Sequence, residues 1–249
     1  MSKSDNEGVK KNGEFVKMRG IGIPVRLYKL QNPKLDGDEV LKLMKKHLWG
    51  DGAEEGFLKP RKLNGEVQAE YVVSYPTHYY KLDKEGRIVP FSVMAQDKGE
   101  IHVRYNTGVI ELRGSYLAAK RSVAKTIEIT GVKADPMTLS DEAMDKLMRK
   151  AKEVSTVTIS NLENPYLNSL EIRGEAIKRA PEILIFRKRQ RGRIQTLRGT
   201  YSLPSGQMLT CFFNSKGSFI IYRKGEGIYA DDLEHLVSYL ESLTMSEAQ

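Results

Sequence analysis

A basic run in the second half of the chain has the most pronounced chemical character of any short segment. It reads Arg-Lys-Arg-Gln-Arg-Gly-Arg over residues 187–193 and so places five cationic side chains within seven residues. Such side chains neutralise phosphates, and phosphate contacts require charge but no particular base sequence. The run is also typical of a nuclear localisation signal, or of a solvated turn between two strands. The net charge of +8 favours an anionic partner, with nucleic acid as the first candidate and an incidentally basic protein as the alternative.

Two pairs of adjacent aromatic residues supply the other chemistry that a nucleic-acid ligand needs. Tyr79–Tyr80 and Phe212–Phe213 each lie in a segment of strand-like composition. Aromatic rings stack on bases of any sequence, which makes them common in nucleic-acid binding surfaces. Neighbouring side chains in a strand point to opposite faces, so only one ring of each pair can face a ligand. We expect the other ring of each pair to lie in the core.

The sequence offers little for catalysis or for a cofactor. The single cysteine, Cys211, leaves no disulfide within the chain, and with only four histidines it leaves almost no zinc site of the Cys/His type. No phosphate-binding glycine loop of the Walker type and no Gly-x-Ser-x-Gly motif is present. Asp135 and Asp141 could join a two-metal site only if the fold brought further carboxylates near them. We therefore predict a protein that is not an enzyme and that carries no cofactor.

Composition also bears on location. No window approaches the roughly 20 apolar residues that a membrane helix needs. Residues 2–17 are polar and charged and lack the apolar core of a signal peptide. A single cysteine suits a reducing compartment. We expect no membrane association and an intracellular protein, nuclear in a eukaryote and cytoplasmic otherwise.

A strand–turn–strand unit followed by a helix occurs twice. Residues 101–112 form a predicted hairpin around an Asn-Thr-Gly turn, and a helix with apolar residues at helical spacing begins after the cap residue Ser115. Residues 211–223 form a second predicted hairpin, and a helix over 231–243 follows it. Because a repeated unit constrains architecture more than any single motif, we expect two similar halves.

The remaining segments fit this division into two halves. Asp36 or Asp38 can cap a helix that ends near Gly50, and alternating residues predict strands before and after it. The expected strands of the first half are 21–30, 67–74, 78–82, 87–94 and 101–112. The expected segments of the chain are a disordered tail at 1–18, a first repeat at 19–131, a connecting helix at 132–154 and a second repeat at 155–249.

The second half allows two alignments with the first. In the favoured alignment a helix over 167–178 matches the first helix, and an apolar strand over 182–187 follows it. The competing alignment instead matches the predicted helix over 140–152. That helix shares an acidic pair followed by Lys, Leu and Met with the helix after Asp36.

Several motifs, in the expected order, resemble the two repeats of the TATA-binding protein family. The hairpin at 105–108 with Gly114, the helix start Ser-Tyr-Leu-Ala-Ala-Lys-Arg at 115–121 and the strand segments at 69–71 and 75–82 resemble the first repeat. Residues 180–187 and the Phe-Asn-Ser sequence at 213–215 resemble the second. The resemblance implies an α+β fold in which two pseudo-symmetric repeats form a curved antiparallel sheet, a saddle with helices on its convex face.

The resemblance also implies how DNA would be held. Members of the family lay the concave sheet on the minor groove and insert apolar wedges between base steps. The wedge positions correspond here to Tyr75, Tyr105, Ala180 and Phe213, and alanine cannot act as a wedge. The residues that we expect to contact DNA, as wedges or at phosphates, are Tyr75, Lys81, Tyr105, Arg113, Arg187, Lys188, Arg189, Phe213 and Arg223.

Two functions remain open from the sequence. The first is a DNA-binding transcription initiation factor with weakened TATA-specific features, whose partners would be double-stranded DNA and other initiation factors. Its TATA-reading asparagines are lacking in the first repeat, and both repeats are enlarged, before residue 105 and over 193–207. The alternative is a saddle-fold protein-interaction adaptor that does not bend DNA. A concave face lined by cations would favour the first function, whereas a filled one would favour the second.

Overall fold

The computed structural model describes residues 15–17, 22–31, 35–50, 52–63, 65–164, 166–175, 177–222 and 227–245. The chain folds into two compact units. The N-terminal unit comprises Pro24–Thr138 with Lys216–Phe219, and the C-terminal unit comprises Met1–Ile23, Leu139–Ser215 and Ile220–Gln249. Both units combine antiparallel strands with helices, which confirms the predicted α+β class. No helix within the described ranges is long and apolar enough to cross a membrane.

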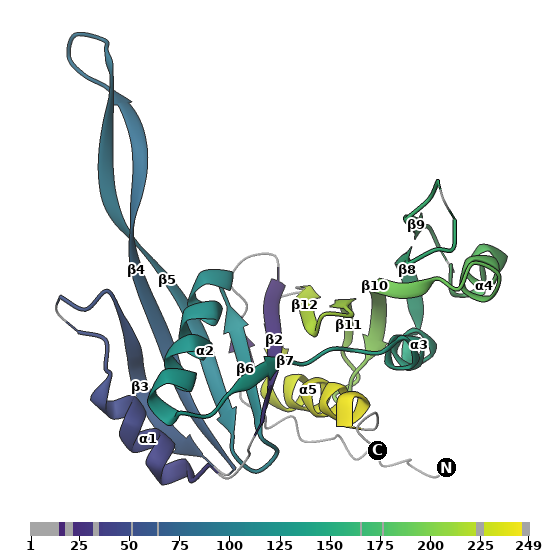
Figure 1. Cartoon of the computed structure of the whole chain (residues 1–249), viewed down its shortest axis with the longest axis horizontal. Helices are drawn as coiled ribbons and strands as arrows, with labels where there is room; N and C mark the ends of the chain where they lie inside the picture. The colour runs from purple at the N-terminus through teal and green to yellow at the C-terminus, as the bar shows by residue number, and fades with distance from the viewer. Residues whose placement is uncertain are drawn as a thin grey trace, which may run out of the picture. The chain divides into compact units, whose positions relative to one another are not determined.

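Five antiparallel strands form the sheet of the N-terminal unit (Figure 1). Their order across the sheet is β3 (Glu55–Leu63), β4 (Glu66–Leu82), β5 (Ile88–Arg104), β6 (Val109–Gly114) and β2 (Gly22–Leu30). A short strand, β7 (Ala134–Pro136), also pairs with β2 and lies in the segment expected to hold only a connecting helix. The core forms where apolar side chains from alternate strand positions, among them Tyr71, Ile101 and Leu112, meet α1 (Gly37–Lys46) and α2 (Tyr116–Thr130).

Helices α1 and α2 begin where the sequence predicts them, because polar side chains accept hydrogen bonds from their first backbone amides. Asp36 accepts a hydrogen bond from the Asp38 amide at the start of α1, and Ser115 accepts one from Ala118 at the start of α2. Gly131 ends α2 in the left-handed conformation that glycine adopts without strain. Gly114 has a positive φ of 110°, which L-residues rarely adopt, and a Cβ there would lie only 3.0 Å from the β5 backbone at Lys98 and Gly99.

The C-terminal unit contains a further series of antiparallel strands. Its strands follow the order β11 (Met208–Asn214), β10 (Arg193–Ser202), β8 (Glu153–Ser160) and β9 (Ser169–Arg173). After β11 the chain continues through β12 (Ser218–Tyr222), β13 (Gly227–Tyr229) and α5 (Ala230–Met245). Helix α3 (Asp141–Lys150) is capped by Ser140, as expected, and the Tyr201 hydroxyl donates to its Leu147 carbonyl at 3.1 Å.

Two predicted elements of the C-terminal unit are wrong. The segment predicted as a helix over 167–178 forms β9, the 3₁₀ turn η1 (Ile177–Arg179) and a bend between them. Gly174, an unfavourable helix residue, lies in that bend, while pairing with β8 satisfies the backbone of β9. The segment predicted as a strand over 182–187 lies in the helix α4 (Pro181–Lys188). Proline at its first position sets the helical φ angle and lacks the amide that a strand would pair.

The observed elements fit the competing alignment better. A helix, four strands and a helix follow one another as α1, β3, β4, β5, β6 and α2 in the first half. The second half has α3, β8, β10, β11, β12 and α5 in the same order, with β9, η1 and α4 inserted after β8 and the short β13 inserted before α5. In this order of elements the helix at 141–150, and not the segment at 167–178, takes the place that α1 has in the first half.

Strands β4 and β5 extend beyond their neighbours as a two-stranded ribbon arm (Figure 1). Strand β3 pairs with β4 only as far as Val73, and β6 pairs with β5 only from Gly99 onward. Residues 74–82 and 88–96 thus pair with each other alone, around the predicted turn at 83–86. The sequence predicted breaks in these strands at residues 75–77 and 95–100. The structure has no such breaks, and each strand runs continuously for 17 residues.

The prediction of a disordered tail over residues 1–18 is wrong at residues 15–17. Residues Phe15–Lys17 form β1, which pairs with β13 in the register Phe15 to Tyr229. Phenylalanine and valine in this segment favour an extended strand. The rest of the expected tail lies outside the described residues.

Candidate nucleic-acid interface

The basic run lies where α4 ends and β10 begins. Arg189 caps α4, and Arg191 has a positive φ of 49° in the turn that follows. The Gly192 amide donates to the Phe186 carbonyl at 3.1 Å, and a side chain at Gly192 would collide with Ile159 and Leu162. This tight turn directs the chain into β10 and brings together a set of exposed cations, Lys188, Arg189, Arg191 and Arg193.

Arg187 has a different environment from the rest of the run. Its guanidinium contacts two carboxylates of α3, Asp145 and Asp141, the latter at 2.5 Å. Burial alone would lower the pKa of Arg187, but the two carboxylates outweigh it and raise that pKa. Asp141 also accepts the Ile194 amide at 2.9 Å. Arg187 therefore ties α4 to α3, while Asp141 also ties the start of β10 to α3, and the expected DNA contact at Arg187 is replaced by a structural ion pair.

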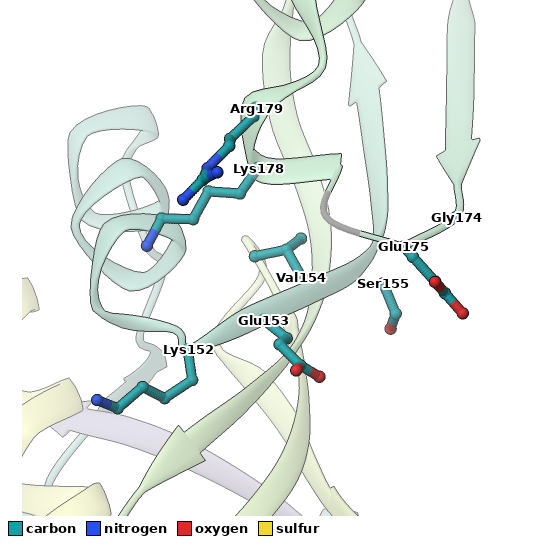
Figure 2. Close-up of a pocket in the computed structure, with 8 residues that line it drawn as sticks. All are labelled: Lys152, Glu153, Val154, Ser155, Gly174, Glu175, Lys178 and Arg179. Atoms are coloured by element: carbon teal, nitrogen blue, oxygen red, sulfur yellow. The ribbon is translucent and has the colours of Figure 1, made fainter.

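A hollow of about 850 Å³ lies beside η1 in the same unit (Figure 2). Lys152, Lys178 and Arg179 lie toward one side of it, and Glu153 and Glu175 toward the other. The Lys178 ammonium donates to the Arg149 and Ala151 carbonyls at 2.6 and 2.9 Å and so caps the end of α3. These cations were not predicted as ligands, although adjacent Lys and Arg at 178–179 were a visible signal. Mixed charge around the hollow does not match a polyanion.

The predicted contact Arg113 belongs to an ionic cluster on the N-terminal unit. The cluster occupies the sheet face opposite the apolar core, and its members come from β4, β5 and β6. They are Glu66, Glu100, His102, Arg104, Glu111 and Arg113. Arg113 and Arg104 contact the two carboxylate oxygens of Glu111 at 2.5 and 2.6 Å. Arg113 is thus paired with carboxylates of its own unit and is not an unpaired cation that DNA could contact.

Electrostatics in this cluster follow from burial and pairing. Glu111 is 0% exposed, so burial alone would raise its pKa. The neighbouring Arg113, His102 and Arg104 outweigh burial and lower the pKa of Glu111 to about 2. Burial would likewise lower the pKa of His102, but its contacts with Glu100 and Glu66 outweigh this and raise it. The cluster is therefore held together when Glu111 is ionised and His102 is protonated.

We predict that the stability of the N-terminal unit passes through a maximum in mildly acidic solution. The contribution of Glu111, about 3 kcal/mol, is present above its unfolded pKa of 4.5 and is lost as the pH falls toward 2. The contribution of His102 is complete below 6.5 and is lost as the pH rises through its raised folded pKa. Urea unfolding between pH 2 and 9 measures both limbs of this pH dependence: the acid limb, due to Glu111, and the alkaline limb, due to His102. In His102→Gln the alkaline limb should disappear, and its persistence would contradict the assignment.

The predicted aromatic wedges do not form one exposed set. Phe213 is 0% exposed and packs edge to face on Tyr201, with ring centroids 5.4 Å apart. Tyr75 and Tyr105 are half-buried and pack against the core of the N-terminal unit. The Tyr105 ring fills the space above Gly37, where a side chain would collide with it. Phe213 is therefore a core residue, because its position in β11 points inward.

The remaining predicted residues differ in exposure. Lys188 and Arg189 are exposed on the basic turn, as a phosphate contact requires. Lys81 is exposed on the ribbon arm, with its ammonium 5.3 Å from the centroid of the Phe91 ring. Arg223 lies outside the described residues. Within the described ranges, no group of three or more His, Cys, Asp or Glu residues is placed to hold a metal ion.

The basic turn is consequently the candidate interface. It joins two residues of the predicted set, Lys188 and Arg189, to Arg193, which the sequence showed only as a member of the run. Comparison with known proteins adds no identity, because no protein-family model and no curated protein sequence matches the chain.

Proposed function

We propose that the chain is a DNA-binding transcription initiation factor with two TATA-binding-protein-like repeats. It would hold duplex DNA mainly through phosphate contacts. One observation carries the proposal: Lys188, Arg189 and Arg193 are exposed at the junction between α4 and β10. None of the three has a carboxylate within 4.0 Å in the described part of the chain. Cations without an internal partner are available to phosphates, and each contact releases counterions from the DNA.

The order of elements supports the repeat part of this proposal. Each half contains a helix, four strands and a closing helix in the same order, with β9, η1, α4 and β13 as insertions in the second half, and the first half keeps the predicted hairpin and capped helix at Ser115. The saddle itself is part of the proposal. In a saddle, the two repeats would share one curved antiparallel sheet and be related by an approximate two-fold axis, and α1, α2, α3 and α5 would cover its convex side.

The mode of binding follows from which side chains are exposed. The buried Phe213 is not a wedge, and Arg113 and Arg187 are paired with carboxylates. Base-specific reading of a TATA element is therefore not part of the proposal. Phosphate contacts alone give binding that depends little on sequence and strongly on salt.

We predict that replacing Lys188, Arg189 and Arg193 with alanine weakens DNA binding and flattens its salt dependence. The slope of log K against log salt should lose about 0.9 for each phosphate contact removed. Fluorescence anisotropy with a labelled duplex, at several salt concentrations, gives this slope. The matched control replaces Lys42, Lys45 and Lys46 of α1, which removes the same charge from exposed positions.

The two triple variants separate a local contact from a general charge effect. The control should keep the wild-type slope, because its lysines lie on another element. Equal slopes in both triple variants, or no binding of the wild-type protein at low salt, would contradict the proposal.

The second candidate function is a protein-interaction adaptor. The observation in its favour is the ionic cluster around Glu111, which pairs the cations that the resemblance would place against DNA. If the wild-type protein is folded but binds no DNA at any salt concentration, the adaptor function is favoured.

A further inference from the structure

One face of the ribbon arm is apolar and exposed. In the pairing of β4 with β5, Pro76 lies opposite Met94, Tyr80 opposite Pro90 and Leu82 opposite Ile88. Directly opposed residues lie on the same side of a sheet, and every second residue returns to that side. The even-numbered residues of the arm therefore share one side, and those over 76–82 and 88–94 form the surface that we call the apolar arm face: Pro76, His78, Tyr80, Leu82, Ile88, Pro90, Ser92 and Met94.

Exposure and charge distinguish this face from the rest of the molecule. Four of its side chains are more than half exposed, at 76% for Tyr80, 71% for Ile88, 68% for Leu82 and 63% for Met94. The face carries no Asp, Glu, Lys or Arg, although such residues make up 29% of the chain. His78 and Ser92 face each other across it, with Nδ1 and Oγ 2.7 Å apart. A face without cations does not suit a phosphate backbone, whereas charge-depleted apolar centres are typical of protein interfaces.

The other face of the arm is better covered. Tyr75 packs against the core of the N-terminal unit, and the rings of Tyr79 and Phe91 lie 5.6 Å apart on this side. An isolated two-stranded ribbon is only marginally stable in water, so a covering layer on the apolar arm face would stabilise it. That layer would cover the apolar arm face and would not pair with the edges of the arm. Pro76 and Pro90 lie on those edges and lack the backbone amide that an added strand would need. Both prolines tolerate ladder pairing only where their nitrogens point outward.

We propose that the apolar arm face binds the same face of a second copy of this chain, in a two-fold symmetric dimer. The area is sufficient: the exposed side chains contribute about 600 Å² per copy, so two copies bury about 1,200 Å², the lower end of a standard interface. Charge also permits it, because two uncharged faces approach without the repulsion expected between other surfaces of a protein with a net charge of +8. A two-fold axis lets each apolar arm face meet an identical one, so that the same contact covers the face of both copies.

Sedimentation equilibrium of the full chain tests the dimer. We expect dimers at micromolar concentration and a dissociation constant raised at least about 100-fold in Leu82→Ser/Ile88→Ser, because each copy loses two large apolar side chains. The matched control is Leu184→Ser/Ile185→Ser, which removes two exposed aliphatic side chains from α4. The control should remain dimeric. A monomeric wild-type protein, or a dimer unaffected by the arm variant, would overturn the proposal.

Cross-linking tests the geometry without disturbing the apolar side chains. The native Cys211 is buried, so an oxidant such as copper phenanthroline should link copies of Ser92→Cys through the arm. Ser169→Cys, at an exposed position of β9, should give no covalent dimer. Equal cross-linking of both variants would place the contact elsewhere and overturn the proposal.

The dimer does not depend on the proposed function. The triple alanine variant of Lys188, Arg189 and Arg193 should sediment as the wild-type dimer whether or not it binds DNA. If the wild-type protein is monomeric and the arm variant instead loses affinity for duplex DNA, the arm is a nucleic-acid contact and the dimer proposal fails. If the dimer forms and DNA does not bind, only the proposed function fails.

Discussion

Replacing Glu111 with glutamine is expected to lower the free energy of unfolding of the N-terminal unit by about 3–5 kcal/mol. The carboxylate is 0% exposed and holds the guanidiniums of Arg104 and Arg113 at 2.6 and 2.5 Å. A neutral amide of the same shape leaves both cations largely buried without their main counter-charge. The measured quantity is the midpoint and slope of urea unfolding, followed by far-UV circular dichroism at neutral pH.

The control for this change is Glu70→Gln. Glu70 lies on the same strand as Glu66, but it is partly exposed and its ion pair with Lys98 is long, at 3.8 Å. Exposed pairs of this kind contribute at most about 1 kcal/mol, so the control should unfold almost as the wild type does. If Glu111→Gln proved as stable as the control, the cluster would not hold the sheet together and the predicted acid limb would also vanish.

Local signals in the sequence predicted the element boundaries that depend on one or two residues. Ser115 and Ser140 predicted helix starts because their hydroxyls accept from an amide three residues later. The same local rules were wrong over 167–187. There, pairing with β8 outweighed helical periodicity, and Pro181 favoured a helix over a strand-like composition. Tertiary pairing decided the first of these segments and is not visible in a short window, whereas the second segment turned on the position of Pro181 within the chain.

The candidate site was only partly predictable for a related reason. The basic run identified Lys188 and Arg189, but the pairing of Arg187 with Asp141 and Asp145 joins residues more than 40 positions apart in the chain. The ionic cluster depends on the register that sets His102 opposite Glu111, which composition does not reveal. The ribbon arm was divided in the prediction, at 75–77 and 95–100. Proline normally interrupts a central strand but is tolerated on an edge.

Replacing Phe213 with alanine is expected to destabilise the C-terminal unit by about 3–5 kcal/mol, because it removes a fully buried ring and leaves a cavity beside Tyr201. The resemblance to the TATA-binding protein family instead places this ring between bases, where its loss would reduce DNA bending. Urea unfolding measures the first effect. Energy transfer between dyes at the ends of a short duplex measures the second, under conditions in which the variant is folded.

The neighbouring Phe212 provides the matched control. It follows Cys211 in the same strand, points to the opposite face and is half-buried, so Phe212→Ala should cost less stability than Phe213→Ala. We expect both folded variants to bend DNA as the wild type does, because neither the core ring nor its neighbour belongs to the basic turn. If Phe213→Ala kept its stability and lost bending, the ring would reach DNA through a rearranged sheet, and the wedge implied by the resemblance would be correct.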